Sequence, residues 1–246
     1  MRRNILTVSF AALLASALPT SAHEPGSDEF NQAIRDYLLA NPQILGEMQA
    51  AFDAKQQELA EEAQAQALAE NSDRIFRSPH DLVLGNPNGD VTIVEFYDYN
   101  CGFCARAMQD MQTVIEADAN VRFVLKEFPI LGPNSTDAHV VSMAVGRVAP
   151  EKYGEFHQRL LGLQESKNAE VAARVASELG IDLADLEAAM VDPAEDEAFA
   201  EAYSIARSLQ ISGTPAYVVG DSVVFGAQGA NELLAQVKKA REKVSN

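Results

Sequence analysis

The sequence is poor in cysteine, since Cys101 and Cys104 are the only two thiols among 246 residues. A disulfide between residues so close together closes too small a loop to staple a domain, so a purely structural bridge explains the pair poorly. The four histidines are single and scattered. Zinc sites usually draw four ligands from paired clusters, whereas two thiolates alone can hold Cu(I). A redox dithiol and a Cu(I) site are the functional interpretations that stay open.

Positive charge is also scarce. The chain has 19 Lys and Arg against 36 Asp and Glu, which gives a formal net charge of −17. Nucleic acids and anionic membranes attract basic surfaces, so this balance disfavours both as partners. An acidic surface by itself indicates solubility and identifies no partner.

Long apolar segments are missing after the N-terminus. There, Arg2 and Arg3 precede an apolar stretch over residues 5–18, which is too short for an ordinary membrane span, and small residues follow up to Ala22. The pattern predicts a signal peptide over residues 1–22, cleaved after Ala22, and an exported, periplasmic protein. An uncleaved anchor is the alternative. Export would bring a dithiol into contact with folding, cysteine-containing client proteins.

The two cysteines form a Cys-Gly-Phe-Cys motif at the end of an apolar, β-rich run over residues 91–97. The residues after Cys104 contain no helix breaker, and Met108, Met111 and Ile115 recur at helical spacing. A strand, a turn bearing Cys101 and a helix are therefore predicted. The helix N-terminus would favour a thiolate at Cys101. We expect Cys101 to be the exposed nucleophile and Cys104 the resolving thiol, with no cofactor or metal beyond the disulfide that they form.

The mature chain divides by composition into a helical extension, residues 23–76, and a second region, residues 77–246. Residues 30–74 are rich in Ala, Gln and Glu, and Asn41-Pro42 separates two predicted helices. The helices share an apolar stripe that needs a partner: Phe30, Ile34, Leu38, Leu45, Met48 and Phe52. We expect the extension to join two or three copies of the chain. The alternative is that it folds back on its own catalytic domain.

The second region has the pattern of an α/β domain. Strands are predicted near residues 82–84, 91–97 and 121–128, and the last two enclose the Cys101 helix in a parallel βαβ unit. A helical block over about residues 133–209 follows. Residues 216–219 and 223–225 predict a β-hairpin, and residues 230–243 a closing amphipathic helix.

This frame resembles the thioredoxin fold, and the helical insertion makes it similar to the DsbA-like thiol:disulfide oxidoreductases of the thioredoxin superfamily. The resemblance depends on three segments in the same order, residues 95–104, 125–132 and 213–216. The helical extension resembles that of the suppressor-of-copper-sensitivity C proteins. The resemblance implies disulfide exchange with cysteine-containing exported clients and a membrane redox partner that reoxidises or reduces the dithiol.

It also implies roles for further residues. Pro215 would form a cis peptide bond beside the cysteines, and Thr214 would offer backbone groups to an extended client peptide. Glu95 would be a partly buried acid near Cys104 that relays its proton, paired with Lys126. Without the resemblance, Glu95 is as readily an acid at an exposed strand edge.

The chain departs from the best-known oxidase of this family, which has Pro-His between its cysteines and Val before the cis-proline. Here Gly102, Phe103 and Thr214 occupy these positions. We therefore expect a less acidic Cys101, a less oxidising disulfide and a lean toward isomerase or reductase activity. Periplasmic Cu(I) binding by the same thiolates, a dithiol oxidase and a non-enzymatic peptide-binding adaptor are the alternatives.

Overall fold

A computed structural model of the chain describes residues 25–191 and 194–244. The predicted signal peptide, residues 1–22, lies outside the described residues. Within them, no helix is both long enough and apolar enough to pass through a bilayer. The chain forms two compact units, Met1–Glu58 and Leu59–Asn246, which we describe separately.

The first unit contains helix α1, Asp28–Ala40, and most of α2, Gln43–Glu70. Ser27 caps α1 by accepting a hydrogen bond from the N–H of Phe30 at 3.2 Å. At the other end, the N–H of Asn41 bonds to the carbonyls of Tyr37 and Leu38. Pro42 follows, which confirms the predicted break at Asn41-Pro42. No residue of α1 is buried.

The second unit is built on a five-stranded sheet with the order β1-β3-β2-β4-β5. Its strands are listed here in chain order: Leu82–Gly85, Val91–Tyr97, Val121–Glu127, Ala216–Val219 and Ser222–Phe225. Strands β2 and β3 are parallel and are joined by helix α4, Gly102–Ala117; the other pairs are antiparallel. The predicted βαβ unit and C-terminal hairpin are both confirmed.

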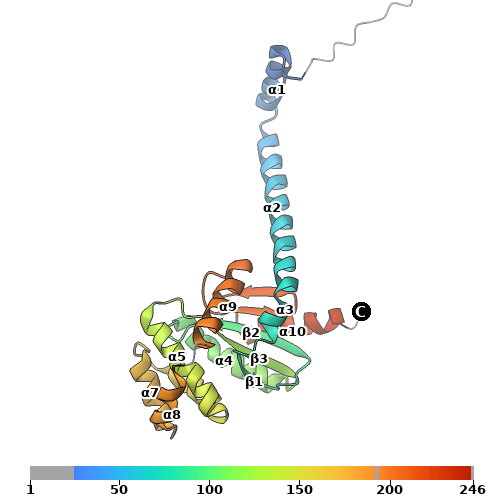
Figure 1. Cartoon of the computed structure of the whole chain (residues 1–246). Coiled ribbons are helices and arrows are strands. Elements are labelled where there is room, and N and C mark those ends of the chain that lie inside the picture. The colour runs from blue at the N-terminus through green and yellow to red at the C-terminus, as the bar shows by residue number, and fades with distance from the viewer. Residues whose placement is uncertain (1–24, 192–193, 245–246) are drawn as a thin grey trace, which may run out of the picture. The chain divides into compact units, whose positions relative to one another are not determined.

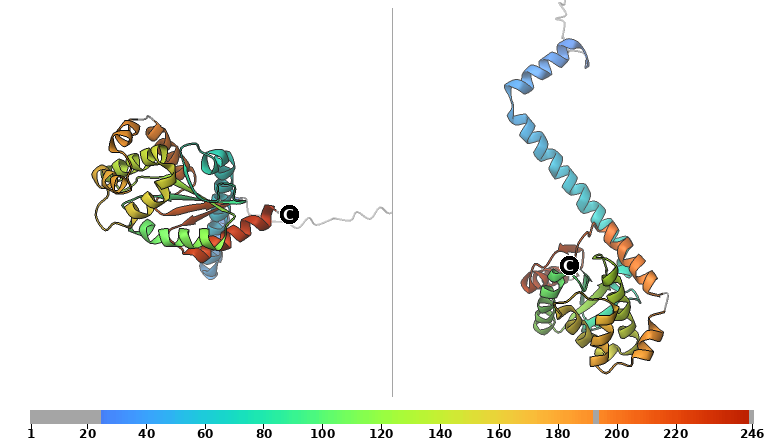
Figure 2. Two further views of the ribbon diagram at one scale, coloured as in Figure 1. Left: turned by 90° about the horizontal axis from the view of Figure 1, so that it is seen from below. Right: turned by 90° about the vertical axis from the view of Figure 1, so that its left-hand side faces the viewer.

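Helices cover both faces of the sheet (Figure 1). On one face, α4 and α10, Ala230–Val244, pack side by side against residues such as Ile93 and Phe123 (Figure 2, left). On the other, α3, Ser72–Phe76, and α9, Ala194–Ser208, pack against Val94 and Val124. Alternate residues of each strand therefore enter two separate hydrophobic cores.

The helical insertion lies between β3 and β4. It comprises α5, Pro133–Val148; a short 3₁₀ helix, Pro150–Lys152; α6, Tyr153–Gly162; α7, Ala169–Glu178; α8, Leu183–Ala189; and α9. Helix α5 packs against α6, α7 and α8 and is the centre of this group. The predicted fold class, a thioredoxin-like α/β domain with a helical insertion and an N-terminal helical extension, is confirmed.

Candidate dithiol active site

The dithiol lies where β2 passes into α4. After Tyr97, the chain turns through Asp98, and the N–H of Cys101 bonds to the carbonyl of Asp98 at 3.0 Å. Cys101 is the N-cap residue of α4, and its extended backbone allows the helix to begin at Gly102. The predicted strand, turn and helix are confirmed.

The two sulfurs differ in accessibility less than we expected. Cys101 is 7% exposed and Cys104 is completely buried. The prediction that Cys101 is exposed is therefore wrong, because the loop before β4 packs onto this residue. The Cys101 thiol donates a hydrogen bond to the carbonyl of Thr214 at 3.2 Å. Cys101 is still the only thiol of the pair with any surface open to a client.

The surroundings of Cys101 favour its thiolate. A hydrogen bond from the Cys104 thiol is the largest cause, and together with the Thr214 side chain and the N–H groups of Phe103 and Cys104 it lowers the Cys101 pKa to about 5 in spite of desolvation. This value lies between about 7 for thioredoxin and about 3.5 for DsbA. Cys101 is therefore a thiolate at neutral pH.

Cys104 has the opposite preference. Burial raises its pKa far above the usual range, and its hydrogen bond to Cys101 and the nearby charge of Glu95 raise it further. Cys104 is thus held as a thiol that donates to the Cys101 thiolate. The pair combines a ready nucleophile with a buried, protonated second thiol.

The loop before β4 carries the residues predicted to contact the dithiol. The Thr214–Pro215 peptide bond is cis, as the resemblance implied. The carbonyl of Pro215 accepts a hydrogen bond from the N–H of Gly226 at 2.8 Å, which ties this loop to the end of β5. Thr214 reaches Cys101 in both protonation states, through its carbonyl to the thiol and through its side chain to the thiolate.

Glu95 lies inside the core, only 3% exposed, so the alternative of an exposed strand-edge acid is wrong. Burial raises its pKa to about 8, and the charge of Cys101 adds to the shift. The Tyr217 hydroxyl approaches Glu95 at 3.5 Å. Since the charge of Glu95 also acts on Cys104, this buried carboxyl belongs to the surroundings of the dithiol.

The predicted Glu95–Lys126 pair is wrong. Glu95 is opposite Leu125 in the parallel register of β2 and β3, so Lys126 projects from the other face of the sheet. Its ammonium instead binds Asp81 at 2.7 Å and Glu201 at 3.3 Å. The same ammonium donates to the carbonyl of Arg74 at 3.0 Å. Lys126 thus fastens α3 and α9 to the sheet and is not placed to tune the dithiol.

The residues between the cysteines face outward. Phe103 is 57% exposed, and the guanidinium of Arg106 lies 4.3 Å from the centre of its ring. A Cβ atom at Gly102 would have open space around it. The Phe103 and Arg106 side chains are not among the groups that lower the Cys101 pKa. Those groups are Cys104, Thr214 and the backbone N–H groups.

Sequence reasoning missed the anchors of the turn before Cys101. Asp98 is completely buried, and its carboxylate accepts from the N–H groups of Asn100 at 2.7 Å and Leu131 at 2.9 Å and from the Ser135 hydroxyl at 2.8 Å. An Asp bonded to the N–H two residues later is a local turn signal that could have been read from Asp98 and Asn100. The distant partners, Leu131 in the loop after β3 and Ser135 on α5, carry no such signal.

A second missed anchor is a buried polar cluster behind the turn. The N–H of Tyr99 donates to Nε2 of His139 at 3.2 Å, so Nδ1 of His139 carries the proton and donates to Glu127. The Tyr99 hydroxyl bonds to Ser142 at 2.8 Å. These bonds link the turn before Cys101 to β3 and α5 and fix its position.

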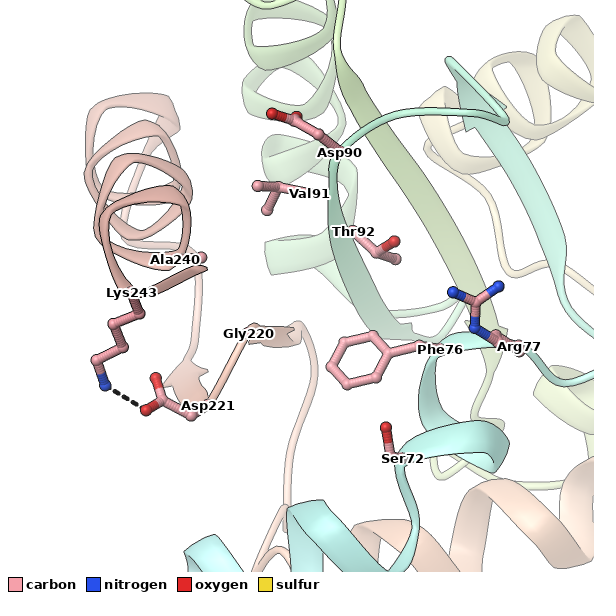
Figure 3. A pocket seen from close by; sticks show the side chains of 10 residues that line it. All are labelled: Ser72, Phe76, Arg77, Asp90, Val91, Thr92, Gly220, Asp221, Ala240 and Lys243. Atoms are coloured by element: carbon pink, nitrogen blue, oxygen red, sulfur yellow. Dashed lines mark hydrogen bonds and ion pairs between the residues drawn. The ribbon is translucent and has the colours of Figure 1, made fainter. Parts of the chain in front are cut away.

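A separate pocket of about 450 Å³ lies at the opposite end of β2 from the dithiol (Figure 3). Asp90, Val91 and Thr92 line one side and Asp221, bonded to Lys243, lines another. It holds none of the residues predicted for catalysis. Within residues 25–191 and 194–244, no group of three or more His, Cys, Asp and Glu side chains is arranged to hold a metal.

Comparison with known proteins places this site in a family context. The chain matches the DSBA-like thioredoxin domain over residues 92–238 and the copper resistance protein ScsC N-terminal domain over residues 28–58. A thioredoxin-like oxidoreductase from Silicibacter pomeroyi is 40% identical, covering 70% of this chain and 98% of that one with a TM-score of 0.67. Proteus mirabilis ScsC in a transitional conformation is 27% identical, covering 87% and 94% with a TM-score of 0.66.

A relative of another kind matches over part of its length. The Na(+)/H(+) antiporter NhaA 3 of Salinispora tropica is 26% identical over 165 residues, which are 65% of this chain and 24% of the antiporter. The chain spans about a quarter of the length of the antiporter relatives that it matches.

Proposed function

Because this chain belongs to the family of DsbA-like thioredoxin domains, we propose that it is a thiol-disulfide oxidoreductase acting on client proteins through Cys101 and Cys104. The observation that carries the proposal is the opposite pKa shift of the two thiols. Burial alone would raise both, whereas here one is lowered to about 5 and the other is raised. Disulfide exchange needs a thiolate that attacks and a second thiol that resolves the mixed disulfide.

In the reducing direction, the Cys101 thiolate attacks a client disulfide. A bond forms between Cys101 and one client sulfur, and the other client sulfur leaves as a thiolate. Cys104 then loses its proton and attacks the Cys101 sulfur, which forms the Cys101–Cys104 disulfide and releases the second client thiolate. Two electrons pass from the dithiol to the client. The oxidising direction is the reverse, and a dithiol or disulfide redox partner resets the pair.

Glu95 is proposed as the group that receives the Cys104 proton. A carboxyl with a pKa of about 8 can both accept and return a proton near neutral pH, which a proton relay requires. The negative charge of Glu95 opposes ionisation of Cys104 until the proton moves. Tyr217 holds the carboxyl beside the thiol. Thr214 and Pro215 are proposed to receive the client backbone next to Cys101.

The direction is proposed to lean toward isomerase or reductase. No histidine lies between the cysteines, and the Cys101 pKa of about 5 is less depressed than about 3.5 in DsbA. We expect a reduction potential near about −180 mV, more negative than about −120 mV for the strongest oxidants. Equilibration with glutathione measures it, and refolding of a substrate with scrambled disulfides tests isomerisation. A potential at the oxidising extreme would overturn the lean.

Export to the periplasm is proposed from the N-terminal signal pattern, and contact with a membrane redox partner is proposed from the family resemblance. Trapping the thiols in cells with an alkylating mass tag would report whether the pair is kept oxidised or reduced. It would separate an oxidase, kept as the disulfide, from an isomerase, kept as the dithiol.

Cu(I) binding is a second candidate, favoured by the match of residues 28–58 to a domain named for copper resistance. Cys101 and Cys104 would supply two soft thiolate ligands. Stoichiometric retention of Cu(I) together with no reduction of insulin disulfides would support this candidate and overturn the oxidoreductase proposal. Insulin reduction that is abolished in Cys101→Ser would do the reverse.

A further inference from the structure

A groove of about 590 Å³ opens beside the dithiol. One wall is the turn before α4 and the start of that helix, including Asn100, Gly102 and Arg106. The other wall is the loop between α6 and α7, including Glu165 and Lys167. Gly102 follows Cys101 directly, so the groove begins at the residue next to the nucleophile.

The loop is fastened to the residue before the nucleophile. The side-chain amide of Asn100 donates to the carbonyl of Lys167 at 2.9 Å, and the N–H of Lys167 donates to the Asn100 side-chain oxygen at 2.8 Å. Asn100 also donates to Ser135 at 3.0 Å. This paired bond fixes the position of the Lys167 backbone relative to Cys101, independently of the Lys167 side chain.

Lys167 is the unusual group in the groove. It is only 7% exposed, yet its ammonium has no hydrogen bond or ion pair with any residue in the described part of the chain. The two nearby acids are otherwise engaged. Asp98 accepts hydrogen bonds from Asn100, Leu131 and Ser135, and Glu165 is paired with Arg174. Burial lowers the Lys167 pKa, although the charges of Asp98 and Glu165 act in the opposite direction. The Lys167 ammonium is not among the fully buried polar atoms that lack a partner, so it can still meet a ligand in the groove.

Arg106, on the opposite wall, is a second cation available to a ligand. Its guanidinium stacks on Phe103, and it has no ion pair among the residues that the structure describes. Two unpaired cations at one groove are notable in a chain with 36 acidic and 19 basic side chains.

We propose that this groove binds a carboxylate side chain of the client, within a few residues of the cysteine that exchanges with Cys101. The inference rests on the proposed function, and it assigns the substrate class as cysteines flanked by Asp or Glu. Lys167 and Arg106 are specificity residues. They supply the charge, and the Asn100 bond holds the loop so that the charge stays next to the reacting sulfur.

The test uses three peptides of one sequence, each carrying a single cysteine as its mixed disulfide with thionitrobenzoate. One has Glu before the cysteine, one has Glu after it, and one has Gln at both positions. Attack by Cys101 on the peptide sulfur forms the Cys101–peptide disulfide and releases coloured thionitrobenzoate, so absorbance reports the rate. We expect the reduced protein to react about three- to tenfold faster with one or both Glu peptides than with the Gln peptide.

The preference should shrink in salt and should fall toward unity in Lys167→Met and in Arg106→Met. Both changes keep an unbranched side chain, and Arg106 is exposed, so at least the second variant should fold. Lys238→Met, on α10 and outside the groove, is the matched control and should keep the preference. If repulsion by the net charge of −17 decided the rates, the Gln peptide would react faster than the two Glu peptides.

Equal rates for the three peptides, or a preference that survives both substitutions, would overturn the inference while leaving the proposed function intact. Equal slowing of all three peptides would show a structural effect and would also overturn it. Release of no thionitrobenzoate from any peptide would overturn the proposed function and the inference together.

Discussion

At the scale of single residues, the two thiols owe their difference to position. Cys101 caps α4, where the N–H groups of Phe103 and Cys104 face its sulfur, while Cys104 lies one turn inside with no access to water. Each supports the other, because the Cys104 thiol donates to the Cys101 thiolate. The hydrogen bonds at the start of α4 therefore lower the Cys101 pKa in spite of the desolvation that opposes them.

This asymmetry predicts unequal effects of replacing the two cysteines. Cys101→Ser should abolish disulfide exchange, because no other thiol has open surface. Cys104→Ser should keep the attacking thiolate but lose the step that releases the client, so mixed disulfides with clients should accumulate. Non-reducing gels after acid quenching measure both. Equal residual activity in the two variants would contradict the roles.

Glu95 leads to a prediction about pH. Its pKa is about 8 when folded and 4.5 ordinarily, so between these values the unfolded chain releases a proton that the folded chain keeps. Glu95 therefore does not reduce the free energy of unfolding below pH 4.5. As the pH rises from there to about 8, its contribution lowers that free energy by at most about 1.4 kcal/mol per pH unit. Glu95→Gln should remove this fall and be more stable than the parent at pH 8.

Denaturant unfolding of the oxidised parent and of oxidised Glu95→Gln at pH 4.5 and pH 8 measures this effect without titration of the thiols. The difference between the two proteins removes the contribution of Asp81, whose pKa burial raises to about 7. The same variant should resolve mixed disulfides at least about tenfold more slowly if Glu95 receives the Cys104 proton. If Glu95→Gln gains stability but resolves mixed disulfides at the parent rate, Glu95 is a buried acid that takes no part in proton transfer from Cys104.

At the scale of elements, the register of β2 and β3 separates two polar systems. The Glu95 side chain, on β2, enters the core beneath α4. The Lys126 side chain, on β3, enters the core beneath α3 and α9 on the opposite face of the sheet. There Lys126 meets Asp81, whose pKa burial raises to about 7. The sheet therefore insulates the dithiol from the ion cluster that holds the end of the helical extension.

Lys126→Met should consequently destabilise the protein without changing its redox chemistry. Removing the cation leaves Asp81 and Glu201 buried without it, which costs about 3 kcal/mol. The loss should be larger at pH 8 than at pH 5, where the carboxyls can take up protons. Chemical denaturation measures it, and Lys238→Met, whose side chain is exposed, should change stability by less than about 0.5 kcal/mol.

The reduction potential and the Cys101 pKa should stay at the parent values in Lys126→Met. A shifted potential with unchanged stability would mean that Lys126 acts on the dithiol after all.

The same elements show what a sequence can predict. Periodicity and turn residues predicted the strand over residues 91–97, the helix after Cys101 and the hairpin, because each is decided by neighbours in the chain. The Glu95–Lys126 pair failed because it depends on the register between two strands, and one residue of offset exchanges the faces. The bonds from Asn100 to Lys167 join residues 67 positions apart, and nothing local to either marks the other.

At the scale of the whole molecule, the helical extension leaves much apolar surface in water. Eight large apolar side chains from α1 and α2 are between 42% and 76% exposed: Ile34, Tyr37, Leu38, Leu39, Leu45, Met48, Phe52 and Leu59. Where α1 meets α2, an apolar hollow of about 450 Å³ is lined by Leu38, Leu39, Pro42, Ile44, Leu45 and Met48. A concave apolar surface of this kind can accept large side chains of another copy.

We therefore predict that the extension joins two or three chains, with a trimer favoured by the resemblance of the extension. Each large side chain that becomes fully buried contributes about 1.5–3 kcal/mol, so several together exceed the cost of ordering the chains. Light scattering on the mature chain should give two or three times the monomer mass. A chain that starts at Leu59 keeps Ala67 and Leu68, which are buried in the second unit, and should be monomeric.

A full-length pair of substitutions tests the same surface without truncation. Met48→Gln with Phe52→Gln should shift the mature chain toward monomer, whereas Gln49→Glu with Gln56→Glu on the same helix should not. Linked copies would raise the effective concentration of a second Cys101 around a mispaired client, so the dissociated variant should keep insulin reduction per site but lose part of its isomerase rate. A monomeric parent chain would contradict association through the extension. An isomerase rate that is the same in the assembled and dissociated proteins would contradict the proposed benefit of linking the copies.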